Sequence, residues 1–323
     1  MKANLALLSF IPLFISLSGC LKESNNPSDI SPNDWSSVPT LTGKYISDIS
    51  VTNSAIFAVS KNDTLFRSTN VGASWTAMNV KNCSLISAQD SLIIVTYPTI
   101  QLSRDGGESW TDITSGLIGK VSKLSVNCSA VLNNILFAGT EEDGIFLSAD
   151  YGVTWTASNR GLESPIIRTM RVQGNSIYAG TSSAIVGGKL KAGGLFVSTN
   201  SGLQWTSTGL TSDTTDIICA TITDNLIIAG GGEQGIFLST NNGINWVAIN
   251  LGLANQYVTS LAVSGNNIFA GTSSGGVFLT KDNGVSWSAF NSDLPRLDVF
   301  ALAIYKNTIF AGTGGGLWER TLK

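Results

Sequence analysis

The segment that decides the fold spans residues 258–290 and reads VTSLAVSGNNIFAGTSSGGVFLTKDNGVSWSAF. Four short runs rich in β-branched and other apolar residues are separated by Gly-Asn-Asn, Ser-Ser-Gly and Asp-Asn-Gly, which are turn-forming sequences. We therefore expect four short strands, at 260–263, 268–272, 276–280 and 287–290. Such a four-stranded antiparallel unit cannot bury both of its faces alone, so it needs neighbours of the same kind.

The same pattern recurs along the chain. Related strings begin at Leu136 (LFAGTEEDGIFLSADYGVTWTAS), Leu226 (LIIAGGGEQGIFLSTNNGINWVAI) and Ile309 (IFAGTGGGLWERTL). Six copies contain Ser/Thr-x-Asp/Asn-x-Gly-x-x-Trp, and their tryptophans are spaced by 35, 45, 50, 41 and 41 residues. A repeat of this length that contains four strands is typical of a β-propeller blade. The acidic or amide residue and the tryptophan of each copy are Asn70 and Trp75, Asp105 and Trp110, Asp150 and Trp155, Asn200 and Trp205, Asn241 and Trp246, and Asp282 and Trp287.

The ends of the chain indicate how many blades there are. Residues 299–320 contain three more strands but no fourth one, whereas residues 33–39 place Trp35 in a setting like that of Trp287. We therefore expect residues 33–39 to pair with the C-terminal blade and close the ring. Residues 33–323 divided by seven give about 42 residues per blade, close to the cleanest repeat spacing. We predict an all-β chain with a single seven-bladed β-propeller of four-stranded antiparallel blades; six or eight blades are the alternatives.

The six copies resemble the Asp-box, or BNR, repeat of sialidases, sortilin-type receptors, xyloglucan-degrading endoglucanases and photosystem II assembly factors. The resemblance covers residues 33–323 and implies the same propeller fold. Within each copy we expect the Ser/Thr and Asp/Asn side chains to bond backbone groups, Gly to adopt a conformation closed to other residues, and Trp to pack against its own hairpin. Because Asn replaces Asp in three copies, a calcium site would lose affinity there, and we interpret the motif as structural.

The N-terminus has the features of a secretory signal. Lys2 is followed by an apolar run, and Leu17-Ser18-Gly19-Cys20 resembles a bacterial lipobox, which implies cleavage before Cys20 and acylation of that cysteine. The alternative is an ordinary signal peptide that contains a cysteine by chance. We expect a signal peptide at 1–19, a lipidated Cys20 with a flexible tether at 20–32, and the propeller at 33–323. Leu21, where lipoproteins retained at the inner membrane tend to have Asp, favours a cell-envelope location at the outer membrane.

Composition excludes several classes of function. The chain has no histidine, which rules out serine-histidine triads and ordinary zinc hydrolase sites. With 19 basic and 22 acidic residues, it lacks the charge expected of a nucleic-acid-binding protein. Cys83, Cys128 and Cys219 lack metal-ligand spacing, and we interpret them as small buried residues, with one disulfide among them as the alternative. We expect no metal, no cofactor and a monomer.

One face of the predicted ring carries the variable loops. In each blade the A–B and C–D turns lie on one side, whereas the B–C loops and the connections from strand D to the next blade lie on the other. The six repeated motifs are C–D turns and lie opposite that second, variable face, which we expect to bind the ligand. The candidate ligand-binding residues there are Glu141, Glu142, Asp143, Arg160, Glu163, Lys189, Lys191, Glu233, Tyr257 and Arg296.

These features favour a lipid-anchored binding or scaffold module, without catalysis, for a protein or glycan partner. The alternative is a glycoside hydrolase that uses paired carboxylates on the variable loops. A classical sialidase needs three arginines that converge on one site. Here Arg67 and Arg104 lie at or beside the repeated turns, and we expect Arg168 and Arg171 on opposite faces of one strand. The arginine-rich patch of the photosystem assembly factors is also missing, so that role is not implied.

Overall fold

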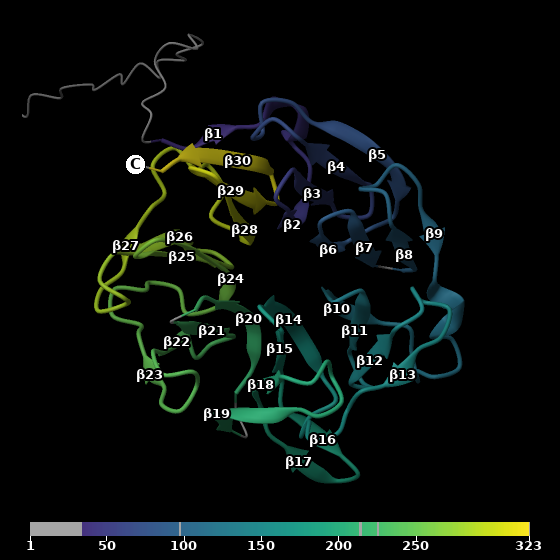
Figure 1. Cartoon of the computed structure of the whole chain (residues 1–323). Helices are drawn as coiled ribbons and strands as arrows, with labels where there is room; N and C mark the ends of the chain where they lie inside the picture. Colours follow the sequence, from purple (N-terminus) through teal and green to yellow (C-terminus); the bar gives the residue numbers. More distant parts are fainter. Residues whose placement is uncertain (1–33, 97, 213–214, 225, 323) are drawn as a thin grey trace, which may run out of the picture. The chain divides into compact units, whose positions relative to one another are not determined.

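Seven four-stranded antiparallel sheets surround a central axis as the blades of a propeller (Figure 1). The computed structural model describes residues 34–96, 98–212, 215–224 and 226–322, so the predicted signal peptide and Cys20 lie outside the described residues. Within those ranges the only helical elements are two short 3₁₀ turns, η1 (Pro39–Leu41) and η2 (Thr114–Gly116), and no helix is suited to crossing a bilayer. The prediction of an all-β, seven-bladed propeller is confirmed.

In blades 1 to 6 the four strands lie in chain order from the axis to the rim. In blade 7 the N-terminal strand β1 takes the outermost place. Blade 1 contains β2 (Ile46–Val51), β3 (Ile56–Ser60), β4 (Thr64–Ser68) and β5 (Thr76–Lys81). Blade 2 contains β6 (Leu85–Gln89), β7 (Leu92–Thr96), β8 (Ile100–Ser103) and β9 (Thr111–Asp112). Blade 3 contains β10 (Val126–Leu132), β11 (Ile135–Thr140), β12 (Ile145–Ser148) and β13 (Thr156–Ala157). Blades 4 and 5 contain β14 (Ile167–Gln173), β15 (Ser176–Thr181), β18 (Gly193–Ser198) and β19 (Thr206–Ser212); and β20 (Ile217–Ile222), β21 (Ile227–Gly231), β22 (Ile236–Ser239) and β23 (Val247–Ala248). Blades 6 and 7 contain β24 (Val258–Ser264), β25 (Asn267–Thr272), β26 (Gly276–Thr280) and β27 (Ser288–Ala289); and β28 (Val299–Tyr305), β29 (Thr308–Thr313), β30 (Gly316–Thr321) and β1 (Ser36–Ser37).

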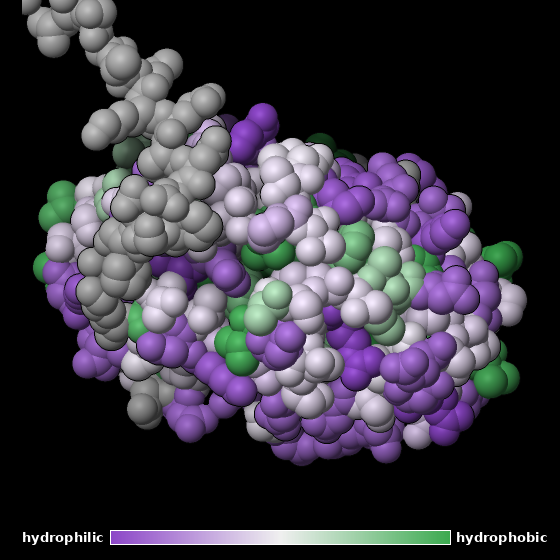
Figure 2. Space-filling model, turned by 90° about the horizontal axis from the view of Figure 1, so that it is seen from above, coloured by the Kyte–Doolittle hydropathy of each residue, from purple (hydrophilic) through white to green (hydrophobic). Residues whose placement is uncertain are grey.

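The hydrophobic core is divided among the contacts between blades. Seven clusters of buried side chains are present, and each joins two adjacent blades. Because a middle strand packs against a neighbouring blade on each face, β3 and β7 are buried at every position, without polar alternation. The surface seen at the edge of the ring is mostly hydrophilic, with hydrophobic residues scattered over it (Figure 2).

Strands from the two ends of the chain meet in blade 7. β1 pairs antiparallel with β30, with Ser36 opposite Glu319 and Ser37 opposite Trp318. Trp35 is 3% exposed, packs edge-on against Phe290, and donates from Nε1 to the Phe290 carbonyl oxygen at 2.7 Å. The predicted closure of the ring by the N-terminal segment is confirmed.

The six copies of the motif form nearly identical turns, which we call the repeat turns (residues 68–75, 103–110, 148–155, 198–205, 239–246 and 280–287). In one of them, Ser198 Oγ accepts from Gly202 N and donates to Asn200 Oδ1, and Asn200 Oδ1 accepts from Gln204 N. The same three bonds recur in all six turns, at 2.6–3.0 Å. The expected backbone bonding within the motif is therefore present.

Every Asp of a repeat turn has a hydroxyl residue four positions later, whereas Asn occurs with or without one. Asp150 Oδ2 accepts from Thr154 Oγ1, and the other two aspartates have a serine in the same place. Asn70 instead donates from Nδ2 to Ser74 Oγ, whereas Gln204 and Asn245 follow the remaining two asparagines. These bonds hold the pKa of Asp150 and Asp282 at about 2, mainly through Ser and Thr donors.

The repeat turns also connect neighbouring blades, in addition to the expected contact of the tryptophan with its own hairpin, where Trp246 Nε1 bonds the Gly243 carbonyl oxygen. Trp205 Nε1 donates to the Ser158 carbonyl oxygen of the preceding blade at 2.8 Å. The glycine of each turn approaches the preceding blade as well: a Cβ on Gly202, whose φ is +82°, would lie 2.6 Å from Phe137 Cε1. The reason is that the tryptophan lies at the start of the outermost strand, where its own blade has no further strand to cover it.

Candidate binding site at the channel mouth

An irregularity that recurs in the inner strands of six blades builds the candidate site. The inner strand of every blade except blade 2 has a register shift near its start, typical of a β-bulge, that leaves one residue unpaired. A bulge re-aims its extra side chain. Here all six unpaired residues line one pocket at the mouth of the central channel, on the side of the B–C loops: Ser47, Asn127, Arg168, Ile218, Thr259 and Phe300.

This pocket, which we call the mouth pocket, has a volume of about 740 Å³, and most other lining residues lie in the loops just before the inner strands or in B–C loops. Its rim is aromatic on two sides. Tyr45 stacks on Phe300 with ring centroids 4.6 Å apart, and Lys61 Nζ lies 5.2 Å from the Tyr45 ring centroid. Tyr257 is 45% exposed. Burial, and secondarily the charge of Asp298, raises the pKa of Tyr45, so its hydroxyl stays protonated at neutral pH.

A fixed cation lies in the wall of the mouth pocket. Arg168 donates from Nη1 to Glu141 Oε2 at 2.6 Å and from Nε to Ser182 Oγ at 2.8 Å. Asn127 bonds the same Glu141 oxygen and the Ile167 carbonyl oxygen, which joins blades 3 and 4. Because these partners orient Arg168 while its side chain remains about one-third exposed, the guanidinium can still contact a ligand.

Asp216 is the single carboxylate among the described residues that line the mouth pocket. Its Oδ1 accepts from Ser183 N at 3.2 Å. A glycosidase of the usual kind needs two carboxyl groups across the scissile bond. No such pair is present in this lining, and the described residues contain no cluster of three or more side chains suited to hold a metal ion.

The sequence-predicted site residues are dispersed, and only some of them lie at the mouth pocket. Tyr257 lines the mouth pocket, and Glu141 reaches its wall through Arg168. Asp143 Oδ2 accepts from Ser122 N and Oγ, so it holds the preceding interblade loop. Glu142 lies at the same contact, 3.4 Å from the Ser122 hydroxyl.

The other predicted residues lie away from the mouth pocket. Arg296 forms two hydrogen bonds with Asp298, at 2.8 and 2.9 Å. Arg160 is exposed, and its carbonyl oxygen accepts from Trp205 N in the repeat turn of the next blade. Lys189 and Lys191 lie on β17 (Lys189–Lys191), which pairs with β16 (Ala184–Val186) in a hairpin inserted into blade 4. Glu163 and Glu233 are exposed in loops.

Arg168 and Asn127 were not among the sequence-predicted site residues. The relevant signal is positional: each bulged residue directly follows the first apolar residue of an inner strand. Arg168 and Arg171 were expected on opposite faces of a strand. The bulge between Ile167 and Thr169 shifts that alternation, and the two arginines line two different pockets.

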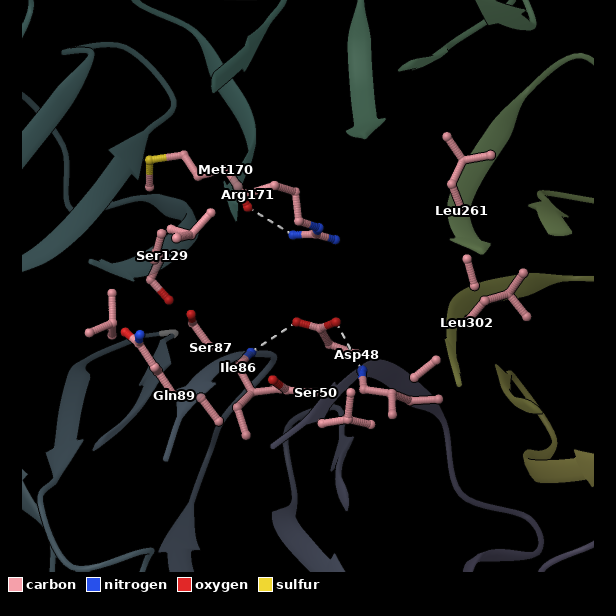
Figure 3. Close-up of a pocket in the computed structure, with 18 of the residues that line it drawn as sticks. Asp48, Ser50, Ile86, Ser87, Gln89, Ser129, Met170, Arg171, Leu261 and Leu302 are labelled. Atoms are coloured by element: carbon pink, nitrogen blue, oxygen red, sulfur yellow. Dashed lines mark hydrogen bonds between the residues drawn. The ribbon is translucent and has the colours of Figure 1, made fainter. Parts of the chain in front are cut away.

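A second pocket of about 500 Å³, the channel pocket, is lined by later residues of the inner strands. Asp48 and Arg171 point toward each other across it (Figure 3). Asp48 accepts from Ile86 N and Ile49 N, both at 2.9 Å, while Arg171 donates to the Met170 carbonyl oxygen. Burial raises the pKa of Asp48 to about 6, against the opposing effects of these backbone donors and of Arg171.

The three remaining cysteines are free thiols in the structure. Cys83 and Cys219 are buried, as expected, whereas Cys128 is half-buried. Burial raises the pKa of Cys83 to about 11 and that of Cys128 and Cys219 to about 12. All three are therefore protonated and slow to react at neutral pH.

The architecture is similar to that of several solved structures. YCF48 bound to a D1 peptide superposes with a TM-score of 0.66 at 17% identity, covering 91% of this chain and 98% of that one. YCF48 from Cyanidioschyzon merolae gives 0.65 at 16%, covering 89% and 98%. A xyloglucanase from Xanthomonas campestris gives 0.65 at 15%, covering 90% of this chain and 54% of the enzyme. No family model matches the sequence, and no curated protein is similar enough to count as a relative. At these identities the likeness concerns the β-propeller fold alone.

Proposed function

We propose that the chain is a lipid-anchored cell-envelope protein whose mouth pocket binds an extended segment of a protein partner without catalysis. The observation that carries this proposal is the convergence of six bulged side chains on one opening. They differ in chemistry from blade to blade, including one cation, two hydroxyls, one amide, one aliphatic and one aromatic side chain. Such a mixture gives specificity to a binding surface.

The physical character of the pocket supports a peptide segment. Exposed tyrosines at the rim can pack on an extended chain at small entropic cost, and Arg168 can pair with an acidic side chain or a carboxyl terminus. The structure of YCF48, which has the same type of fold, is described as bound to a peptide. A glycan remains the other ligand class for the same surface, and the experiment below separates the two.

Photocrosslinking tests where the partner binds. The soluble protein from Ser24 onward would carry a benzophenone amino acid in place of Tyr257 and be irradiated with envelope extract. We expect a discrete crosslinked protein from this variant and none from the matched variant at Asn245, which lies exposed in a repeat turn. Equal crosslinking from both variants, or binding only to a glycan array, would contradict the proposal.

A panel of chromogenic glycosides tests the catalytic alternative. We expect no turnover, because Asp216 has no second carboxylate across the pocket. Product release that Asp216→Asn abolishes would make the chain a glycoside hydrolase and overturn our proposal.

Acylation of Cys20 is the proposed anchor. Metabolic labelling with an alkyne fatty acid should mark the protein, and Cys20→Ser should remove both the label and the association with membranes. Leu21→Asp should move the labelled protein from the outer to the inner membrane. A Cys20→Ser protein that still pellets with membranes would contradict this part of the proposal.

A further inference from the structure

Four repeat turns present an exposed aliphatic residue at the same position. The residue after the turn glycine is Val153, Leu203, Ile244 or Val285 in blades 3, 4, 5 and 6, with exposed fractions of 74, 71, 77 and 69%. The same position holds Ala73 in blade 1 and Glu108 in blade 2. A large exposed aliphatic side chain therefore recurs on four consecutive blades and is absent from the other two repeat turns.

These four side chains lie on one rim of the ring. Because they occupy equivalent positions in equivalent turns of blades around one axis, we expect their heights along that axis to match, as contact with a flat surface would require. An uncharged polar residue follows each of them: Thr154, Gln204, Asn245 and Ser286. The four residues thus form separate apolar points between polar turns, unlike the continuous apolar centre of a protein interface.

Two exposed residues lie in interblade loops that contact the repeat turns, although such loops were expected on the opposite face; Arg160 makes the same contact as Leu251 in the loop after blade 3. Leu251 is 73% exposed, and its carbonyl oxygen accepts from Trp287 N in the repeat turn of blade 6. Ile118 is 64% exposed and lies two residues after Gly116, where a Cβ would be 2.8 Å from the Val153 carbonyl oxygen. Both loops therefore lie against the repeat turns of the blade that follows.

The chain enters the ring at the same rim. The described residues begin at Asp34, just before Trp35, which occupies in blade 7 the place that a repeat-turn tryptophan has elsewhere. Cys20 precedes Asp34 by 14 residues, a span of at most about 50 Å when fully extended. Since blade 7 adjoins blade 6, the entry point and the four aliphatic residues lie on five consecutive blades (Figure 1).

We infer that the repeat-turn rim of blades 3 to 6 rests on the lipid bilayer, with the mouth pocket facing away from it. A tether of this length alone permits many orientations, whereas shallow insertion of the aliphatic side chains selects one. Apolar contact rather than charge supplies the attraction, because the charged residues of these four turns, Asp150, Lys281 and Asp282, leave no net positive charge. The inference rests on the anchor proposed above, and the test replaces that anchor with an artificial one so that the two can fail separately.

The test measures which rim contacts lipid. Residues 1–19 are replaced by a hexahistidine tag and Cys20 by Ser, and the protein is bound to phosphatidylcholine–phosphatidylethanolamine vesicles that contain a nickel-chelating lipid. The chain has no histidine of its own, so attachment is through the tag. An NBD fluorophore is placed on Asn245→Cys in a repeat turn or, as the matched control, on Lys189→Cys in β17, while the native thiols react slowly because their pKa values are raised.

On vesicle binding, NBD at position 245 should shift to shorter wavelength and be quenched by nitroxide-labelled lipids, and NBD at position 189 should do neither. The substitutions Val153→Ser, Leu203→Ser, Ile244→Ser and Val285→Ser together should abolish the shift at 245 while the tag still holds the protein on the vesicle. An unchanged thermal midpoint shows that this variant is folded. The inference is overturned by a shift that survives the four substitutions, by a shift at 189 instead, or by no shift at either site.

Discussion

The two rims of the ring differ in what they keep constant. At the repeat-turn rim, six turns share three side-chain hydrogen bonds and a glycine that approaches the preceding blade. At the opposite rim, six bulges share their backbone position while the bulged side chain changes from blade to blade. One rim repeats its side chains and thereby holds the blades together, whereas the other repeats only its backbone position and varies the side chains, which we propose bind the ligand.

Substitutions at the repeat-turn rim should reduce stability most in blade 7, because Trp35 and β1 take the place of a seventh repeat turn there. Trp35→Ala removes a buried indole and its bond to Phe290, and should lower the free energy of unfolding by about 3–5 kcal/mol. Trp35→Phe keeps an aromatic ring and should cost less. Thermal and urea denaturation measure both, and a wild-type midpoint for Trp35→Ala would show that the closing strand does not limit stability.

A pair of glycine substitutions sharpens the role of the repeat turns as contacts between blades. Gly202→Ala places a methyl group 2.6 Å from Phe137 Cε1, whereas Gly174→Ala meets nothing within 4 Å; both glycines have positive φ. Gly174→Ala should cost about 1–2 kcal/mol from backbone strain, and Gly202→Ala a further 1–3 kcal/mol, roughly, from overpacking. Equal losses in denaturant titrations would mean that the close approach has no energetic weight.

The channel between the rims should give a pH dependence of its own. The pKa of Asp48 is about 6 in the folded state, above its usual value, so the folded state binds this proton more tightly than the unfolded state does. Stability should therefore fall as pH rises from about 4 to about 6 and then level off. Asp48→Asn should remove this component of the thermal midpoint measured between pH 4 and 7. A variant with the wild-type slope would assign the dependence to other groups.

The aspartates of the repeat turns should act in the opposite direction at lower pH. Donors from Ser and Thr lower the pKa of Asp105, Asp150 and Asp282, so their contribution is complete above about pH 4 and is lost as pH falls toward 2. Replacing all three with Asn should flatten this acid limb while changing stability little at pH 7, since Asn70 shows that an amide can bond the same hydroxyl. A steep limb that persists in the triple variant, followed by circular dichroism, would contradict this origin.

The smallest stability effect belongs to the variable rim. Tyr257→Ala removes a side chain that is 45% exposed and should change the free energy of unfolding by no more than about 0.5 kcal/mol. The same change should weaken binding of the partner captured by photocrosslinking, as measured by calorimetry. A large loss of stability would indicate that Tyr257 holds the fold rather than the ligand.

The repeat made the blades and their closure predictable. The spacing of Gly-x-x-Trp locates each C–D turn, and Trp35 marks the closing strand. Strand ends were less accurate: a strand at 287–290 was expected, whereas β27 contains only Ser288 and Ala289. Beyond it, Val277 N donates to the side chain of Asn291, so a side chain replaces the backbone partner there.

The mouth pocket was less predictable, for a physical reason. The strand expected to begin at residue 260 begins at Val258, and the bulge at Thr259 interrupts the alternation by which strand faces are assigned. Arg168 was therefore assigned by simple alternation, although the structure places it in the pocket wall beside Glu141. The alternation of faces along a strand applies only to paired residues, so it cannot predict the direction of an unpaired, bulged side chain.

The pairing of β1 with β30 also sets the order of events during synthesis. Ser36 and Glu319, which face each other in blade 7, are 283 residues apart. At a translation rate of about 5–20 residues per second, roughly 15 to 60 s separate the appearance of the two strands. Throughout that interval the first blade has no partner on one side, so the nascent chain exposes the apolar face that later packs on blade 7. The ring is thus a structure that only the finished polypeptide can complete.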